Sequence, residues 1–339
     1  MDQCSREYYY FDTYIEASVY AQNVSDGEAA LDAAADVFER VHRLMNRFDE
    51  GSDIYRVNYA ARGAGPVAVD AETFDLLRTA LSYCEQSGGA FDIGIGALSD
   101  LWGFGAGAGG SDNDPFSDDV SPPDSDQIDI AIGVSGYQKI ILYEDELSVE
   151  TPPGLLIDLG SMAKGYAVQM AANAMRGMGI TSAIINAGGN VYVIGEKLSP
   201  IGTYDAVASE GSNDGGGSRL WNVGVQYPRS APDDEYLAII PASDTAIVTS
   251  GDYARYYIHD GARYHHIIDP ETGSPARASI SVTVTAPDSA LADYLSTAVF
   301  VLGPEKGMGL VEAYPGAEAL IVAPDMSVTA SPGFAGLTD

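Results

Sequence analysis

Residues 158–189 constrain the fold of this chain more than any other stretch. The apolar run 154–157 predicts a strand that ends on the carboxylate of Asp158, and a Gly-Ser turn then leads to a helix beginning near Lys164. Apolar residues follow at helical spacing until Gly177, where the predicted helix stops. The order of these residues therefore predicts a strand, a tight turn and an amphipathic helix.

A second predicted strand, 182–186, runs into Gly188 and Gly189. A helix N-terminus that follows a tight turn and carries Lys164 favours a bound anion, because backbone N–H groups and the helix dipole point there. An ordinary β-α-β unit with a solvated lysine explains the same residues equally well, because glycine-rich turns are weak signals by themselves.

The charge of the chain argues against two classes of partner. Its 49 acidic and 17 basic residues give a net charge of −32 over 339 residues. Such a surface repels nucleic acid and anionic membranes, so we expect neither as a partner. The acidity suits a high-salt medium or a very soluble surface. With 46% hydrophobic residues and no apolar run of about 18 residues, the chain is expected to fold as a soluble protein.

The two cysteines form neither a disulfide framework nor a metal cluster. Cys84 lies in an apolar helical pattern and is predicted to be a small core residue. Cys4 fits the lipid-attachment cysteine of a bacterial lipoprotein whose signal peptide has been replaced by a start Met, although no signal-peptide apolar segment is present. This hypothesis places the protein outside the cytoplasm, anchored to the membrane through Cys4; a cytoplasmic location is also compatible with the sequence.

The rest of the chain mixes predicted helices with strand-rich segments. Residues near 106–126 and 209–218 are low-complexity and are predicted to be flexible insertions. We expect residues 1–7 to form an N-terminal tail and residues 8–335 to form a single domain. The main predicted helices span 27–48, 71–87 and 290–302, and the main predicted strands or hairpins span 8–21, 246–250, 253–268 (with a tight turn at Asp260-Gly261), 279–285 and 320–330.

Two polar residues share one face of the predicted helix 290–302. Asp293 and Thr297 are four positions apart on an otherwise apolar helix. A carboxylate beside a hydroxyl fits a Mg²⁺ site, because Mg²⁺ takes oxygen ligands and usually keeps waters and phosphate oxygens. The structural alternative is that Asp293 caps a neighbouring loop and Thr297 bonds to its own helical turn.

Two consecutive histidines lie in the predicted strand 264–268. Strand alternation sends His265 and His266 to opposite faces, so at most one of them points into a given cleft. A single histidine is usually structural, but one at the mouth of an anion site can act as a general base near neutral pH.

Eight blocks of sequence, in order, resemble the ApbE family of flavin transferases, which move FMN from FAD onto a Thr or Ser of a target protein. Any one block is a weak signal, but their order over nearly the whole chain is specific. The blocks are FDT at 11–13, FDEGSDIYRVN at 48–58, FDIGIGALSDLWGFG at 91–105, DLGSMAKGYA at 158–167, INAGGN at 185–190, TSGDYARYY at 249–257, HHIIDPETGSP at 265–275 and ADYLSTAVFVLG at 292–303.

The resemblance implies an α+β fold, with mixed or antiparallel sheets flanked by helices and an FAD cleft between two lobes of one domain. It implies FAD as the substrate. The residues that it places around FAD are Phe11, Phe48, Asn58, Trp102, Gly103, Phe104, Gly105, Asp158, Lys164, Thr249, Ser250, Gly251, Asp252, His266 and Ile267.

The resemblance also implies the chemistry. His266 matches the family's catalytic histidine and would take the proton from the attacking hydroxyl, while Lys164 would stabilise the phosphate anion. Mg²⁺ would neutralise the pyrophosphate as AMP leaves. The implied Mg²⁺ ligands are the side chains of Asp293 and Thr297 and backbone oxygens at or near Ser161 and Ser296.

Two positions depart from the family pattern. The family often has Asp where this chain has Gln169 and Asn190. Both changes leave the implied metal ligands intact, so we interpret them as tuning of the site rather than loss of activity.

The implied partner is an acceptor flavoprotein with a Thr or Ser flavinylation site, such as a redox-pump subunit or an FMN-binding domain. One alternative keeps the site and replaces the protein hydroxyl by water, which gives a Mg²⁺-dependent FAD pyrophosphatase that produces FMN and AMP. Asn58, near the flavin, is the residue that we expect to decide between them. Another alternative is a flavin-binding storage lipoprotein, which would not need Asp293, Thr297 and His266 together.

Overall fold

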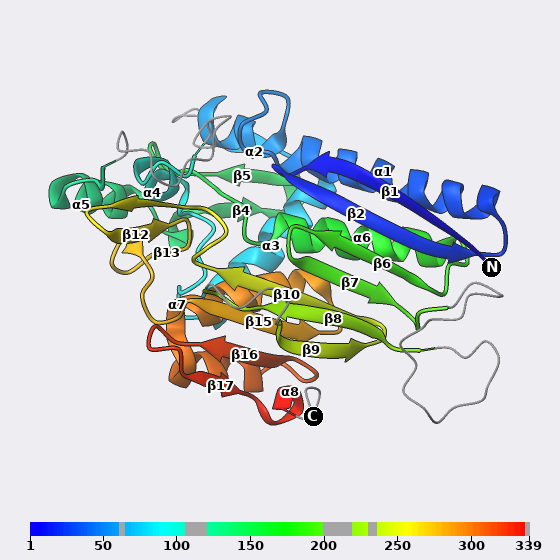
Figure 1. The fold of residues 1–339 in the computed structure, drawn as a ribbon. Coiled ribbons are helices and arrows are strands. Elements are labelled where there is room, and N and C mark those ends of the chain that lie inside the picture. The colour runs from blue at the N-terminus through cyan, green and yellow to red at the C-terminus, as the bar shows by residue number, and fades with distance from the viewer. Residues whose placement is uncertain (61–64, 106–120, 199–218, 230–235, 336–339) are drawn as a thin grey trace.

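An eight-stranded antiparallel sheet forms the centre of the fold in a computed structural model that describes residues 1–60, 65–105, 121–198, 219–229 and 236–335 (Figure 1). Helices flank this sheet, which confirms the α+β class. In spatial order the strands are β1 (Asp2–Tyr10), β2 (Thr13–Ala21), β6 (Ala183–Ala187), β7 (Asn190–Ile194), β10 (Thr245–Gly251), β15 (Ser281–Ala286), β16 (Glu318–Val322) and β17 (Val328–Ala330).

Three long helices cover one face of the sheet. They are α1 (Val24–Met45), α6 (Ala163–Gly177) and α7 (Ser289–Glu312), and their apolar side chains form the main core with those of the strands. Helix α1 begins where it does because the Asn23 side chain accepts a hydrogen bond from the Asp26 N–H (3.0 Å), which caps the first turn.

A hairpin covers part of the opposite face. Trp221 and Val225 of β8 (Trp221–Gln226), which pairs with β9 (Tyr236–Ala242), share an apolar cluster with Val193 of β7. All five residues of β7 are buried. Protein on both faces of the sheet explains why β7 is apolar from Val191 to Ile194 rather than alternating.

Smaller elements lie beside the main sheet, on the left of Figure 1. The turn at Asp260-Gly261, with φ angles of 49° and 75°, joins β11 to β12 and confirms the predicted hairpin. The remaining elements are α2 (Asp53–Tyr55), β3 (Val67–Ala68), α3 (Ala71–Gln86), α4 (Gly96–Leu101), α5 (Ser125–Val134), β4 (Ile141–Tyr143), β5 (Ser148–Glu150), β11 (Tyr256–His259), β12 (Ala262–His265), β13 (Ile268–Asp269), β14 (Ser274–Pro275) and α8 (Pro332–Ala335).

The prediction that residues 1–7 form a tail is wrong. They belong to β1, which pairs with β2 along its whole length from Asp2 opposite Ala21 to Tyr10 opposite Thr13. The segment looks polar because most of its side chains face solvent on an edge strand, whereas Cys4 is only 6% exposed. The Cys4 Sγ lies so close to Gly27 that a Cβ there would be 2.6 Å from it. This packing leaves no room for a lipid, so it does not support the lipoprotein hypothesis.

Two other local predictions need correction. Residues 154–157 form no strand; their backbone is held instead by contacts such as Gly96 N–H to Leu156 O (2.9 Å) and Asp158 N–H to Ile93 O (2.8 Å). The predicted insertion 106–126 ends earlier than expected because α5 begins at Ser125, and residues 106–120 and 209–218 lie outside the described part of the chain. A single domain over 8–335 stays a prediction.

The predicted helix 290–302 is confirmed as the first part of α7. Gly303, with φ 75° and ψ −176°, interrupts the helix just before Pro304, as a glycine can. Among the described residues, none of the helices has the length and apolarity that a membrane span requires.

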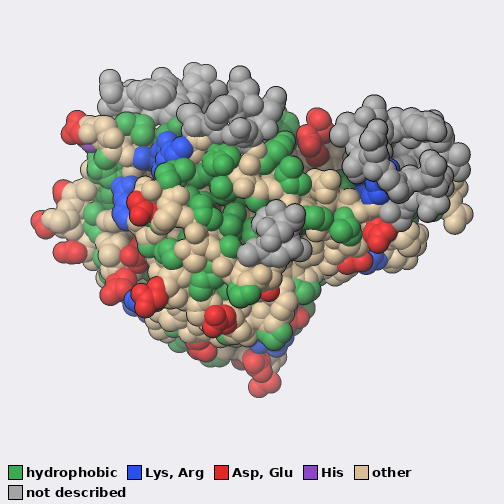
Figure 2. All heavy atoms as spheres, turned by 60° about the horizontal axis from the view of Figure 1, so that its bottom comes forward, with side chains coloured by type: hydrophobic (Ala, Val, Ile, Leu, Met, Phe, Trp, Pro, Cys, Tyr) green, Lys and Arg blue, Asp and Glu red, His purple; other side chains and the backbone are tan. Residues whose placement is uncertain are grey.

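On the face that Figure 2 shows, the acidic side chains are scattered rather than gathered at one place. On the face in Figure 2, Asp and Glu side chains lie mostly along the margin, and Lys and Arg side chains form small groups, the clearest at the upper left.

Candidate active site

Segments from three parts of the chain meet where several strands of the main sheet end. Phe11 lies in the turn between β1 and β2, and Gly188 lies in the turn between β6 and β7. A Cβ on Gly188 would overlap Thr13 Oγ1, so these two turns touch. The Gly189 carbonyl accepts a hydrogen bond from the Thr249 N–H (3.2 Å), which brings the end of β10 to the same place. The structure thus brings together residues of the blocks FDT, INAGGN and TSGDYARYY.

The end of β10 continues the site toward α7. Thr249 Oγ1 lies 2.8 Å from Thr283 Oγ1, and Ser250 Oγ lies 2.8 Å from Ser296 Oγ. Gly251 follows and is buried. Ser250 therefore connects the predicted FAD-binding strand to the helix that carries the predicted metal ligands.

Helices α6 and α7 meet at Gly165 and Asp293. The Gly165 N–H donates to Asp293 Oδ2 (2.8 Å), and a Cβ on Gly165 would overlap Ser289 O and lie 2.6 Å from Asp293 Cβ. Only glycine therefore allows this close crossing. Asp293 is 5% exposed and makes no ion pair with any described residue. Burial raises the pKa of its carboxyl, while the charge of Lys164 and the Gly165 N–H oppose that rise.

We expect Gly165→Ala to destabilise the protein by about 1–3 kcal/mol, because the added methyl group must push α6 away from α7. Urea unfolding measures this change. Gly177→Ala is the matched control, since a Cβ at this last position of α6 has no atom within 4 Å. Equal stability of the two variants would show that the α6–α7 contact is not tight.

The oxygen atoms around Asp293 suit a Mg²⁺ ion that is shared with a substrate. Thr297 lies one turn farther along α7, and Ser161 lies in the turn before α6; both are partly exposed. The Ser296 hydroxyl donates to Asp293 O (2.9 Å) and lies 2.8 Å from Ser250 Oγ, so this side chain already has two partners within the protein. No group of three or more His, Cys, Asp or Glu side chains in the described residues can hold a metal. One buried carboxylate with hydroxyl and carbonyl oxygens fits Mg²⁺ only when waters or phosphates complete its coordination.

The two departures from the family pattern both serve the start of α7. Gln169 Oε1 accepts a hydrogen bond from the Ser289 N–H (2.8 Å), and Asn190 Oδ1 accepts one from the Ser289 hydroxyl (2.7 Å). An amide oxygen accepts these bonds as a carboxylate would. The hydrogen bonds to α7 are therefore kept with less negative charge near Asp293.

The charge of Lys164 acts on both the predicted metal ligand and the predicted base. Its ammonium group donates to Gly160 O (2.9 Å) and remains partly exposed. Its charge acts on both Asp293 and His266, lowering the pKa of each. These three predicted residues, from α6, α7 and the segment after β12, therefore belong to one electrostatic neighbourhood.

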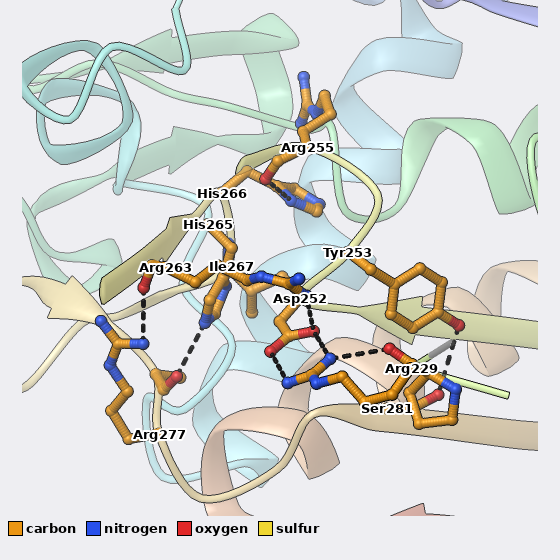
Figure 3. Close-up of polar contacts among 12 residues, drawn as sticks. Arg229, Asp252, Tyr253, Arg255, Arg263, His265, His266, Ile267, Arg277 and Ser281 are labelled. Atoms are coloured by element: carbon orange, nitrogen blue, oxygen red, sulfur yellow. Dashed lines mark hydrogen bonds and ion pairs between the residues drawn. The ribbon is translucent and has the colours of Figure 1, made fainter. Parts of the chain in front are cut away.

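The two histidines face opposite sides, as the strand pattern predicts (Figure 3). His265 is 1% exposed and donates from Nε2 to Ala276 O (2.9 Å); burial lowers its pKa to about 4. His266 is partly exposed, and its Nδ1 lies 3.2 Å from Arg255 O. Because a carbonyl can only accept, Nδ1 carries the proton and Nε2 is left as a base. Burial first, then Arg255, hold the pKa of His266 well below its usual value.

Aromatic residues form the wall beside His266. Trp102 stacks on Tyr264 (ring centroids 5.5 Å apart), and Tyr257 connects Tyr264 to Phe104. Trp102 is 4% exposed and its Nε1 donates to a backbone carbonyl (2.7 Å), so it is a core residue of this wall. The Phe104 ring is 6.4 Å from the His266 ring and is partly exposed. Phe104, rather than Trp102, is thus placed to contact a flavin.

Four other predicted FAD contacts lie in loops or turns. Gly103 is exposed and Gly105 is partly exposed, so their backbones are accessible. Phe48 is 37% exposed beneath the guanidinium of Arg47. Phe11 is partly exposed, and its ring meets the His42 ring edge-on at 5.3 Å.

Asn58 does not have the role that we predicted. It is 3% exposed; its Nδ2 donates to Ile157 O (2.8 Å) and its Oδ1 accepts from the Ile157 N–H (2.7 Å). Both ends of the amide therefore hold the backbone that leads to Asp158 and are not free for a flavin. The prediction that Asn58 selects between protein and water as acceptor loses its physical basis.

Asp252 also has partners within the protein. Arg229 binds both of its carboxylate oxygens (2.7 Å each), and Arg263 binds one of them (3.0 Å), as Figure 3 shows. Asp252 is 5% exposed, so it stabilises this loop rather than presenting its charge. Ile267 is 6% exposed; its carbonyl accepts from the Ala276 N–H (2.9 Å).

Sequence reasoning missed two arginines at the site. Arg255 is the backbone partner of His266, and Arg47 lies 3.1 Å from Asp158 through its Nε. No local sequence pattern marks either arginine as a site residue. The one available signal is that basic residues are rare in this chain, with 17 Lys and Arg among 339 residues.

A cavity of about 450 Å³ lies elsewhere, between the ends of α3 and α5 and the turn at Pro270. Asp92 and Gln138 are among its lining residues, and none of the predicted FAD or metal residues lines it. The cavity is therefore separate from the candidate site.

Comparisons with known proteins show the family of this chain. Residues 11–321 match the model of the ApbE family. The chain is 33% identical over 330 residues to a FAD:protein FMN transferase of Treponema pallidum, covering 95% of this chain and 84% of the relative, and 29% identical to one of Vibrio cholerae, covering 89% and 81%. Its fold is similar to the crystal structure of the ApbE protein of Thermotoga maritima, with a TM-score of 0.83, 31% identity and full coverage of both chains. The chain belongs to the ApbE family.

Proposed function

We propose that this protein is a Mg²⁺-dependent FAD:protein FMN transferase. It attaches FMN through a phosphoester bond to a Thr or Ser of an acceptor protein and releases AMP. The observation that carries the proposal is the proximity of a neutral imidazole, a lysine and a buried carboxylate without an ion-pair partner: His266, Lys164 and Asp293. The curated relatives named FAD:protein FMN transferase support the same reaction.

The residues act in one displacement at the FMN phosphorus. The acceptor hydroxyl gives its proton to Nε2 of His266 while its oxygen bonds to phosphorus. The bond from that phosphorus to the bridging oxygen breaks, and AMP leaves with the electron pair. Lys164 and the N-terminus of α6 stabilise the phosphate charge.

Asp293 and Thr297, with backbone oxygens at or near Ser161 and Ser296, would hold the Mg²⁺. The metal would neutralise negative charge on the phosphates. A buried carboxylate that lacks a cationic contact within the described protein supports this assignment.

The proposal is tested with purified protein, FAD, MgCl₂ and synthetic peptides that differ only in a central Thr, Ser or Ala. Mass spectrometry should find an FMN-sized addition on the Thr or Ser peptide and not on the Ala peptide. AMP should appear in equal amount. Release of FMN and AMP with all three peptides unlabelled would favour the pyrophosphatase, and absence of turnover would favour flavin storage.

We further propose that the protein lies outside the cytoplasm with its acceptor flavoprotein, although the burial of Cys4 gives no support to a lipid anchor there. Cell fractionation tests the location. Recovery of the protein in the cytoplasmic fraction alone would contradict it.

A further inference from the structure

Arg47 is a buried arginine that connects two of the segments implied to contact FAD. It follows the end of α1, and its side chain is 4% exposed. Its Nη2 and Nη1 donate to the two carboxylate oxygens of Asp100 (2.6 and 3.3 Å), and its Nε lies 3.1 Å from Asp158 Oδ2. One guanidinium therefore bridges α4 to the turn before α6.

Asp100 connects Arg47 to the loop that is predicted to contact the flavin. It lies in α4 just before residues 102–105, the segment that includes Phe104. A Cβ on Gly105 would overlap Asp100 Oδ1, so the backbone of Gly105 rests against the same carboxylate. Holding Asp100 in place therefore also holds the loop that follows it.

Asp158 connects Arg47 to the turn that is predicted to contact the phosphates. Its second oxygen, Oδ1, accepts a hydrogen bond from the Gly160 N–H (2.8 Å) and so shapes the turn that leads to Lys164. The guanidinium of Arg47 also lies 4.3 Å above the centre of the Phe48 ring. Three predicted FAD-binding segments, the loop 102–105, the turn at Asp158 and Phe48, thus contact or depend on one side chain.

Arg47 holds these segments without being exposed enough to act as a major FAD contact itself. An arginine can bind two carboxylates in a fixed plane, whereas a lysine offers a point charge that reaches one at a time. If the guanidinium is removed, Asp100 and Asp158 lose their shared cation, and the loop 102–105 is free to move relative to the turn before α6.

We propose that Arg47 is a positioning residue for FAD: it locks the loop 102–105 to the Asp158 turn, so that the flavin side and the phosphate side of the site are held at a fixed separation before FAD binds. This inference rests on the proposed function. It predicts an effect on FAD affinity that is larger than the effect on the rate at saturating FAD.

The test compares Arg47→Met, Arg47→Lys and Asp100→Asn with wild type. The dissociation constant for FAD is measured from the change in flavin fluorescence, and the transfer rate is measured at saturating FAD with the Thr peptide. We expect Arg47→Met to raise the dissociation constant about ten- to hundredfold and to change the saturated rate by less than about threefold. Arg47→Lys and Asp100→Asn should give smaller rises, since each keeps part of the bridge.

Arg176→Met is the matched control. Arg176 also bridges two partners, Asp244 (2.6 Å) and the Tyr192 hydroxyl (3.1 Å), but at the other end of α6. It should lose stability without losing FAD affinity. An unchanged FAD dissociation constant in the Arg47 and Asp100 variants, or the same rise in Arg176→Met, overturns the inference.

Two further outcomes are informative. If Arg47→Met does not fold, Arg47→Lys and Asp100→Asn decide, and wild-type affinity in both of them overturns the inference. If the wild-type protein binds no FAD, the proposed function fails and this inference fails with it. If the wild-type protein binds FAD and all three variants bind it with the same affinity, only this inference is overturned.

Discussion

Asp293→Asn is expected to abolish FMN transfer, by about a thousandfold or more, while leaving the protein at least as stable as wild type. The loss in rate follows because one charged ligand of a catalytic metal contributes several kcal/mol, and each 1.36 kcal/mol is about a factor of ten. The preserved stability follows because burial raises the pKa of Asp293, so its charge is a cost to the fold. An asparagine oxygen can still accept the Gly165 N–H.

Rates are measured by mass spectrometry at saturating FAD and MgCl₂, and stability by urea unfolding. Asp288→Ala is the matched control on the same helix: it removes the cap that accepts from the Leu291 N–H (2.9 Å) and should cost about 1 kcal/mol of stability with little change in rate. A variant Asp293→Asn that keeps more than about a tenth of the wild-type rate would show that Asp293 is not a metal ligand in the reaction.

The parts of the fold that follow local patterns could be predicted from the sequence. Helix α1, the hairpin at Asp260-Gly261 and the break at Gly303 each depend on spacing or turn chemistry within a few residues. The strand β1 could not be predicted in full, because an edge strand with one solvent-facing side reads as a polar tail until its partner is known. The strand predicted at 154–157 is absent for another reason: Leu155 and Ile157 are buried, but the segment pairs with no strand.

The site shows the same division. The spacing of Asp293 and Thr297 and the alternation of the two histidines are local, and the structure agrees with both. Contacts between distant residues are not encoded in any window of sequence. Asn58 bonds to Ile157, 99 positions away, and the tautomer of His266 depends on a carbonyl at Arg255. The resemblance could name these residues but could not supply their partners.

His266→Ala is expected to lower the saturated transfer rate by about 10²- to 10⁴-fold, the usual range for loss of a general base, with little change in FAD affinity. His265→Gln is the neighbouring control: His265 points away from the site, so its replacement should affect stability more than rate. A rate loss in His265→Gln as large as that in His266→Ala would mean that the hairpin, rather than the base, had been disturbed.

The pH dependence separates a base from a merely structural histidine. Because the pKa of His266 is held well below the ordinary value of about 6.5, its Nε2 is unprotonated throughout the neutral range. As the pH falls, activity should stay level through about pH 6.5 and decline only when the lowered pKa is reached. A decline in kcat/KM centred at or above about pH 6.5 that disappears in His266→Ala would contradict the conclusion that burial and the neighbouring positive charges hold the pKa of His266 below its ordinary value. Burial and the positive charges of Arg255 and Lys164 thus keep the imidazole neutral, so that it can accept a proton beside the phosphates those charges attract.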